Sequence, residues 1–384
     1  MTLVGFFKNF WIAISLFIFS TIGYFIFCEK AVIREDYHVP LAEAFLNGRI
    51  DIEPRLEFQE LVERGGKYYV VYPPGPTLTL IPAVAIFGVE FPQTVASIIL
   101  AAGAVALFFL GLKKIPITNQ AAICLALGLG FGSGFLFTAL KGTAWYYSHV
   151  CSIFFLLLTL YLLLGKKIYP LAAGIFLAWA GLCRLPLFLA APVCGYFIYR
   201  QHKKWHLDLI KFVLPLLIGG LLYLGYNYLR FGSLFETGYG LIPGEVDLPF
   251  NQYGIFNYRY IGRQLFISWA ALPGINFVSR GDLTMAQWIV APVLLLLAYL
   301  RRTDKLAWVL IGGAGLVALP SLMHGGYGMS QIGYRFGLDY LVFLLLAIAS
   351  ISSRIKLGYL QLSCLIGIII NLGIVIVISF MKIL

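Results

Sequence analysis

Long apolar runs, many of them close to the ~20 residues that a helix needs to cross a bilayer, recur along the whole chain of 384 residues. Polar segments, most of them short, separate these runs. Because only helices and closed barrels satisfy their own backbone hydrogen bonds in lipid, such runs indicate membrane-spanning helices. The pattern predicts an all-α polytopic membrane protein with about 11 transmembrane helices and a long first extracytoplasmic loop that carries short surface helices.

The polar segments divide the chain into parts of a single integral membrane domain, 1–384. We expect the first span at 10–28, an outer catalytic loop with surface helices at 29–90, spans 2–7 within 91–229, a second outer loop at 230–285, and spans 8–11 within 286–384. The segment 73–91 is short and contains four prolines. We therefore expect it to lie at the surface or to re-enter, although a crossing at this segment stays open.

The charge follows the same division. The chain is 60% hydrophobic and 12% charged, whereas a soluble protein is about a quarter charged. Six short clusters between apolar runs hold a balance of +12, and the rest of the chain holds −1. The positive-inside rule then places these clusters and the N-terminus in the cytoplasm and the long first loop outside. The formal charge of +11 thus reflects a multi-pass protein of the plasma (inner) membrane, and it does not indicate nucleic-acid binding.

The segment 29–76 is the long polar run of this chain, and it holds nine of the seventeen acidic residues. Flexible connectors are rich in Ser and Gly and poor in aromatics. This segment is rich in tyrosine and phenylalanine instead, and 37–48 has the apolar spacing of a short helix. We therefore expect the segment to be folded and to carry the chemistry.

Several polar residues fall at the expected outer ends of spans. Glu35 and Asp36 follow the first span, where an acidic pair can serve as a general base or as a helix cap. Arg184 interrupts an apolar run and Arg335 begins an expected span. Both are suited to bind phosphate, or to form internal ion pairs such as Arg335 with Asp339. The same face is expected to hold His38, Lys67, Tyr72, Lys141, Trp145, His149, Glu236, Tyr239, His324 and Tyr334.

Other site chemistries have no motif in this sequence. It has no HExxH pattern and no paired Cys/His set, so we expect no metal. It also has no phosphate-binding loop between a strand and a helix, so we expect no nucleotide and no other cofactor.

The order of segments resembles a known family. One span and an outer acidic pair precede LAEAFLNGRIDI (41–52) and KYYVVYPPGPTLTLIPAVAIFG (67–88). This order resembles the first half of the glycosyltransferase-C superfamily of membrane glycosyltransferases. That superfamily includes the protein O-mannosyltransferases and the aminoarabinose transferase that acts on lipid A. The stretch GYRFGLDYLVFLLL (333–346) is similar to a stretch near the end of the family's core.

The resemblance implies roles for particular residues. Asp36, or Glu35, matches the position of the catalytic base. Tyr72 and the two prolines after it match the Pro-Pro segment, but the family has a phosphate-binding lysine where this chain has Tyr72. Lys67 or Arg184 could take the place of that lysine.

The implied reaction is an inverting transfer from a polyprenyl-phosphate sugar, with Asp36 deprotonating an acceptor hydroxyl. Arg184, Lys67 or Arg335 would stabilise the departing phosphate. The acceptor can be a lipid, a glycan or a protein, and the other partners are membrane lipids. Two alternatives stay open: a transporter or flippase of a lipid-linked or polar substrate, and a non-catalytic envelope assembly protein. Spans that are almost wholly apolar at mid-depth disfavour the transporter.

Overall fold

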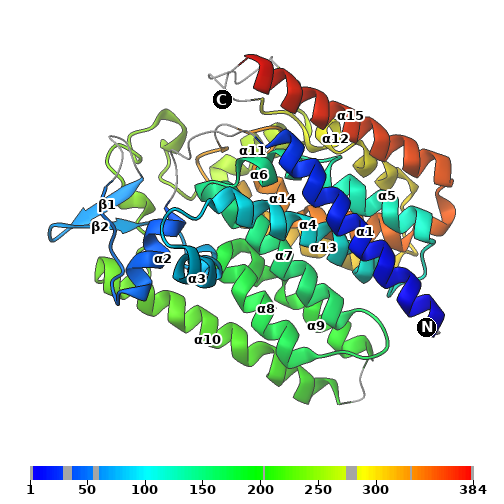
Figure 1. Cartoon of the computed structure of the whole chain (residues 1–384), viewed down its shortest axis with the longest axis horizontal. Coiled ribbons are helices and arrows are strands. Elements are labelled where there is room, and N and C mark those ends of the chain that lie inside the picture. Colours follow the sequence, from blue (N-terminus) through cyan, green and yellow to red (C-terminus); the bar gives the residue numbers. More distant parts are fainter. Residues whose placement is uncertain are drawn as a thin grey trace.

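The computed structural model describes residues 3–28, 37–54, 60–201, 204–273, 283–328 and 331–381. Helices make up most of this part of the chain (Figure 1). Six helices in it are long and apolar enough to cross a membrane: α1 (Leu3–Phe27), α4 (Gln93–Leu112), α7 (Ala144–Leu163), α10 (Trp205–Phe231), α13 (Lys305–Leu322) and α15 (Leu357–Met381). The bent pair α5 (Asn119–Gly130) and α6 (Phe135–Lys141), with an angle of 51°, makes a seventh if it is one span. The protein therefore has the helical membrane architecture that the sequence predicts.

The other expected spans coincide with shorter or irregular elements. They are α8 (Pro170–Cys183), η1 (Leu185–Ala190), α9 (Ala191–Gln201), α12 (Gln287–Val290), η5 (Pro292–Tyr299) and α14 (Leu338–Ser350). A helix of 13 or 14 residues is only ~20 Å long, less than the ~30 Å hydrocarbon core. Two of the breaks precede Pro186 and Pro292, because proline lacks the N–H that would continue an α-helix. The described residues thus hold six or seven helices of spanning length.

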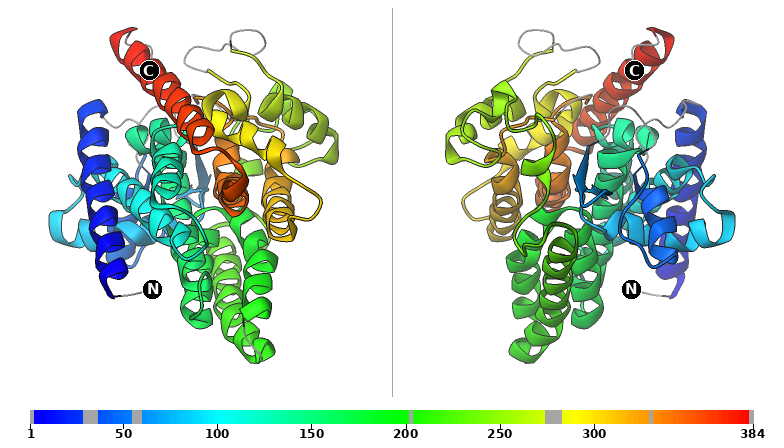
Figure 2. Two further views of the ribbon diagram at one scale, coloured as in Figure 1. Left: turned by 90° about the vertical axis from the view of Figure 1, so that its right-hand side faces the viewer. Right: turned by 90° about the vertical axis from the view of Figure 1, so that its left-hand side faces the viewer.

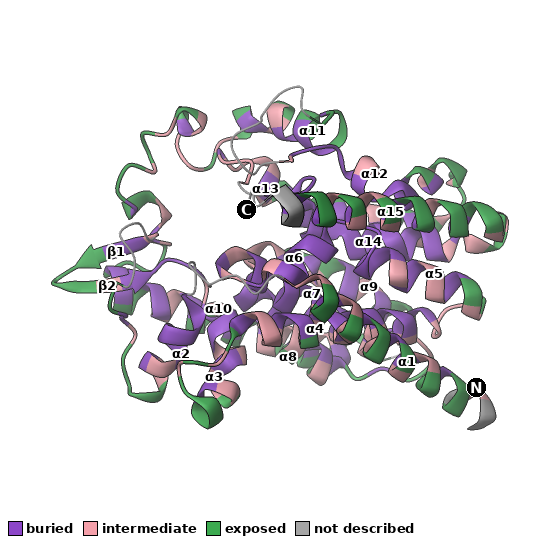
Figure 3. Cartoon of the chain, turned by 45° about the horizontal axis from the view of Figure 1, so that its top comes forward, coloured by how far each residue is buried: buried purple, intermediate pink, exposed green. Residues whose placement is uncertain are grey.

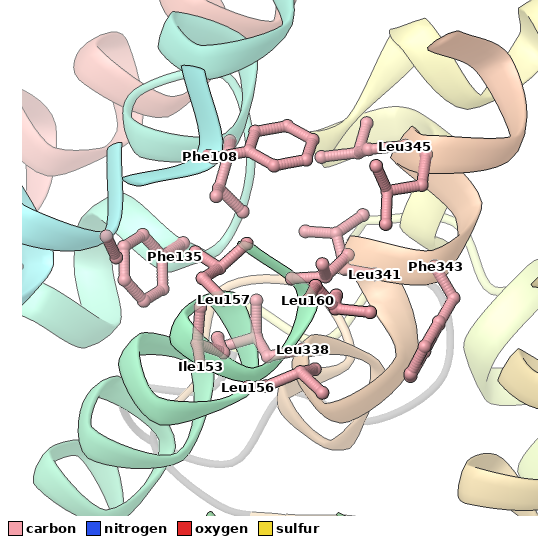
Figure 4. Packing of buried hydrophobic residues seen from close by; sticks show 14 of the residues in the cluster. Phe108, Phe135, Ile153, Leu156, Leu157, Leu160, Leu338, Leu341, Phe343 and Leu345 are labelled. Carbon is pink, nitrogen blue, oxygen red and sulfur yellow. The ribbon is translucent and has the colours of Figure 1, made fainter. Parts of the chain in front are cut away.

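Helix α7 lies at the centre of the bundle. Of its apolar stretch 78% is buried, against 22% for α1 and 28% for α10 and α15. It contacts α4, α8 and α14, and α8 in turn contacts α10 (Figure 2). The close-up in Figure 4 shows how the side chains of α7 meet those of α4, α6 and α14: Phe108, Phe135, Ile153, Leu156, Leu157, Leu160, Leu338, Leu341, Phe343 and Leu345.

Helices α1, α10 and α15 have apolar outer faces. Large apolar side chains such as Trp11, Leu221 and Ile369 are each more than half exposed on them. Figure 3 shows rows of exposed residues along α1 and α15. A soluble protein rarely exposes contiguous apolar surface on this scale. Since these are also the least buried of the long helices, their outer faces are suited to lipid.

The described residues of the expected first outer loop, 37–54 and 60–74, contain a helix and a hairpin. Helix α2 (His38–Leu46) matches the expected short helix and is followed by Asn47 and Gly48. Strands β1 (Leu61–Arg64) and β2 (Lys67–Val70) then pair antiparallel. The sequence-based interpretation had only helices here and missed this hairpin. Its signal is Gly65-Gly66, both with positive φ, as a two-residue hairpin turn requires.

The hairpin is fastened to the end of α10. The Arg230 side chain is buried, and its Nη1 donates to the carbonyl oxygen of Val70 while its Nη2 donates to Asn227 Oδ1 at 2.7 Å. Arg64 of β1 donates to the carbonyl oxygen of Arg230 at 3.3 Å. The first loop is therefore a packed cap at the end of the bundle, seen at the left of Figure 1.

Helix α3 (Gly75–Phe87) follows the hairpin and has 13 residues, so it is too short to cross a membrane alone. A Cβ atom on Gly75 would lie 2.6 Å from the backbone nitrogen of Cys183, so only glycine allows this approach. The contact brings the Tyr72-Pro73 segment beside the end of α8. The remaining elements are α11 (Ile261–Trp269), near the expected second-loop surface helix, and the 3-10 turns η2 (Tyr239–Leu241), η3 (Pro249–Asn251), η4 (Tyr258–Tyr260), η6 (Arg335–Gly337) and η7 (Ser352–Arg354).

Candidate functional site

A cavity of about 460 Å³ lies at the hairpin end of the bundle. The start of α7, the ends of α8 and α13, and the turn η6 just before α14 all contribute lining residues at this end. The segment before α3 and the loop 237–250 complete the walls. By the charge pattern, this is the end that the sequence places outside the cell.

The cavity combines an apolar and aromatic lining with a few charged or polar side chains. The aromatic rings belong to Trp145, Phe250, Phe256, Tyr327 and Phe336. The polar and ionisable side chains include Glu60, Tyr72, Ser148, Arg184, Thr237, Tyr239, Glu245, Ser321, His324 and Arg335. Of the candidates from the sequence, the structure thus gathers Tyr72, Arg184, Tyr239 and Arg335 around one space, together with Trp145 and His324.

Arg184 is held by a buried carboxylate. The residue ends α8 in an extended conformation, and its Nε and Nη2 donate to the two carboxylate oxygens of Asp339 at 3.1 and 2.7 Å. His149 Nδ1 lies 3.0 Å from the same carboxylate. Asp339 and His149 are fully buried, whereas the Arg184 side chain is 18% exposed and lines the cavity. His149 therefore stands behind Arg184 and does not line the cavity.

This pairing corrects one sequence-based alternative. Asp339 was considered as an i, i+4 partner for Arg335 on the same helix, but it binds Arg184 instead. The partner comes from 155 residues away, which no local spacing can predict. Arg335 is left in different surroundings.

Arg335 is 6% exposed and packs among rings. Its guanidinium carbon lies 5.2 Å from the ring centroid of Trp145 and 5.0 Å from that of Tyr146. Its Nε and Nη1 have no hydrogen-bond partner among the described residues. Burial, with a further contribution from Arg184, lowers the pKa of Arg335, yet arginine stays charged at neutral pH. A buried charge with unsatisfied N–H groups is costly. Arg335 also lines the cavity, where a guanidinium group suits an anion.

The Glu60 carboxylate brings negative charge to the wall of the cavity, near the two arginines that line it. This residue directly precedes β1 and Tyr72 follows β2, so the hairpin brings the two together. The Tyr72 hydroxyl donates to Glu60 Oε2, and Trp145 Nε1 donates to the same oxygen at 3.0 Å. Tyr72, where the resemblance would imply a phosphate-binding lysine, is thus directed to a carboxylate. The sequence analysis did not single out Glu60, although recognition of the Gly-Gly hairpin would have paired it with Tyr72.

Two histidines near the cavity are neutral. His38 is buried behind Tyr72, where its Nε2 lies 3.3 Å from the carbonyl oxygen of Ala144 and its Nδ1 lies 2.9 Å from Thr77 Oγ1. Since a carbonyl only accepts, Nε2 carries the proton, and burial lowers the pKa of His38 to about 4. His324 lines the cavity, and its Nδ1 donates to the carbonyl oxygen of Gly326 at 2.9 Å. Burial lowers the pKa of His324 as well.

The other candidates lie in several places. Tyr239 lines the cavity, and burial and the Glu60 carboxylate raise its pKa, so it is a neutral hydroxyl. Tyr334 is buried beside the cavity and does not line it. Glu236 accepts from the backbone N–H of Gly238 at 2.8 Å, outside the lining. Lys67 has a side chain 57% exposed and pairs with Asp51, so it is not among the lining residues either.

The expected base, Asp36 with its neighbour Glu35, lies outside the described residues. Comparison with models of protein families, with curated proteins and with solved structures finds no match. The function is therefore inferred from the cavity itself: two guanidinium groups, two carboxylates and aromatic rings in a largely apolar space. Such a lining suits an amphipathic anion, because the charge is bound by arginine and the apolar part by the walls.

Proposed function

We propose that the protein is an inverting glycosyltransferase that uses a polyprenyl-phosphate sugar at the extracytoplasmic face of the plasma membrane. The observation that carries the proposal is Arg335, buried in the cavity wall with two unsatisfied N–H positions. Arg184 lines the same cavity, so a phosphate there can contact two guanidinium groups. Guanidinium forks match phosphate geometry, which makes this the best place for the leaving group.

The rest of the cavity fits the other parts of such a donor. Aromatic side chains such as Trp145 and Tyr239 offer flat faces and hydroxyl groups, which suit a sugar ring. Leu185, Pro186 and Pro320 offer apolar contact, which suits the first units of a polyprenyl chain. As the glycosidic bond breaks, negative charge grows on the phosphate, and cations already in place lower that barrier.

The resemblance to the glycosyltransferase-C superfamily supports the same reaction and assigns the base to Asp36 or Glu35. Transport would need a polar path through the bundle. Buried apolar side chains of α7 and α14 belong to one packed core, which disfavours such a path between these two helices.

The direct test offers purified full-length protein in lipid nanodiscs a panel of polyprenyl-phosphate sugars, with membrane lipid extract as the source of acceptors. Polyprenyl phosphate released above a protein-free control, detected by mass spectrometry, is the expected result for at least one donor. The matched variant Arg335→Met should release much less. If no donor is cleaved or bound, the proposal is wrong.

The face of the membrane is tested separately. Single cysteines placed near 55 and near 250, in a background without native cysteines, should react with a membrane-impermeant maleimide added to intact cells. A cysteine near 203, in a basic cluster, should react only after the cells are opened. Labelling at 203 in intact cells would place the cavity on the cytoplasmic side.

A further inference from the structure

Two carboxylates among the described residues line the cavity, Glu60 and Glu245. Glu245 belongs to the loop 237–250, and Asn251 contacts its side chain at 3.4 Å. Glu60 lies on the side of Arg335: its hydrogen-bond donor Trp145 is the ring that packs against Arg335, and its charge acts on Arg335 and Tyr239. Of the two, Glu60 is therefore the carboxylate nearer to the proposed phosphate site.

The surroundings of Glu60 hold one of its carboxylate oxygens in a fixed position. Tyr72 and Trp145 both donate to Oε2, from the segment after β2 and from the first turn of α7. Tyr72 is itself buried and packs edge-on against Tyr37 and Trp145. A carboxylate oriented by two rigid aromatic donors is pre-organised for proton transfer, because its position does not need to be found during the reaction.

We propose that Glu60 is the catalytic base of the glycosyl transfer, an inference that rests on the proposed function. The acceptor hydroxyl gives its proton to the Glu60 carboxylate while its oxygen bonds to the anomeric carbon. The bond from that carbon to the phosphate oxygen breaks, and the electron pair leaves with polyprenyl phosphate, which Arg335 and Arg184 stabilise. Glu60 then returns the proton to water.

This assignment competes with two other roles. The resemblance gives the base to Asp36, and Glu60 would then only orient Tyr72 and Trp145. Alternatively, Glu60 serves as a counter-charge that keeps Arg335 in place. The three roles differ in what a neutral isostere does, because glutamine keeps an oxygen that accepts from Tyr72 and Trp145 but cannot take a proton.

The experiment compares Glu60→Gln with Asp36→Asn and with the control Glu63→Gln, an exposed residue on β1 of the same hairpin. Each full-length variant is reconstituted in nanodiscs with the donor that the wild type uses. Two quantities are measured: polyprenyl phosphate released per unit time, and the affinity for polyprenyl phosphate without a sugar. Glu60→Asp is a second variant, which keeps the charge but shortens the side chain.

We expect Glu60→Gln to bind polyprenyl phosphate at least as tightly as the wild type, because a negative charge beside the arginines is gone. Its turnover should fall at least about a hundredfold, as loss of a positioned base does. Glu60→Asp and Asp36→Asn should each lose less than Glu60→Gln, and the control Glu63→Gln should stay within about tenfold of the wild type.

Other results overturn the inference. Glu60→Gln within about threefold of wild-type turnover shows that no proton passes through this residue. Equal loss of binding and turnover shows a counter-charge or a tether. A hundredfold loss in Asp36→Asn alone moves the base to Asp36 and leaves the proposed function standing. If the wild type cleaves no donor, both the proposed function and this inference are wrong.

Discussion

The two arginines that line the cavity differ in their hydrogen bonds. Arg184 gives two hydrogen bonds to Asp339, a carboxylate that also lies 3.0 Å from His149. Arg335 is packed against Trp145 and Tyr146, and two of its nitrogens have no partner among the described residues. One side of the cavity is thus an arginine already paired with a buried carboxylate, and the other is a buried arginine with unsatisfied N–H groups.

The difference separates stability from binding. Breaking a buried ion pair leaves a charge without compensation and is strongly destabilising. Removing a buried charge that has no partner relieves that cost but removes the group that binds. The Arg184 side should therefore be the more important for folding and the Arg335 side the more important for affinity.

The largest effect is expected at Asp339. Asp339→Asn removes the negative charge between Arg184 and His149 and should lower the free energy of unfolding by about 3–5 kcal/mol. Unfolding of the purified protein in mixed micelles measures it. The control is Asp304→Asn, which removes the partner of Arg354 at a partly exposed site and should cost much less. If the free energy of unfolding falls equally in the two variants, the buried ion pair of Arg184 is no more important for folding than a partly exposed ion pair.

Acid should lower the free energy of unfolding through His38, which has a buried neutral ring near Tyr72. Its pKa is 6.5 when unfolded and about 4 when folded, so below pH 6.5 the unfolded chain takes up a proton that the folded one does not. The stability from this site is present above pH 6.5 and is lost as the pH falls to 4, by up to about 3 kcal/mol. Unfolding measured from pH 8 to 4 should show a flatter profile in His38→Gln. An unchanged profile would contradict the neutral, buried ring.

The smallest effect on folding, and the clearest on binding, is expected at Arg335. Arg335→Met should leave the free energy of unfolding unchanged or raise it, while its affinity for polyprenyl phosphate falls at least about tenfold, or ~1.4 kcal/mol. Thermal unfolding and a binding titration on one preparation measure both. Arg184→Lys, which cannot reproduce the fork on Asp339, should lose stability as well as affinity. If Arg335→Met unfolds as easily as Arg184→Lys, the two sides do not differ.

Much of the architecture could be predicted from hydrophobicity and charge. Apolar runs mark α1, α4, α7, α10, α13 and α15, because lipid demands a continuous helix there. Hydrophobicity cannot distinguish such a helix from a short buried one. The segment 286–300 is apolar enough to cross, but it folds as α12 and a 3-10 helix that breaks before Pro292.

The site was predictable only in part. Arg184 and Arg335 could be predicted as site residues because a charge beside an apolar run is costly and is usually paired or functional. Their different surroundings could not be predicted, because the contact of Arg184 with Asp339 joins residues that are 155 positions apart. Glu60 was missed for a simpler reason: its importance follows from the hairpin, and the Gly65-Gly66 turn was not recognised.

We expect the hydrogen bond from Arg230 to Val70 to make the position of the hairpin depend on the thickness of the bilayer. Arg230 occupies the last turn of α10, whose outer face is apolar, and Val70 lies two residues before Tyr72. A helix longer than the local bilayer tilts to bury its apolar length, so bilayer thickness sets the tilt of such a helix. Through one guanidinium group, a change of tilt in α10 moves the strand that positions the Tyr72 hydroxyl. Activity in short-chain and long-chain lipids should then differ, with membrane thickness acting as a regulator that needs no ligand.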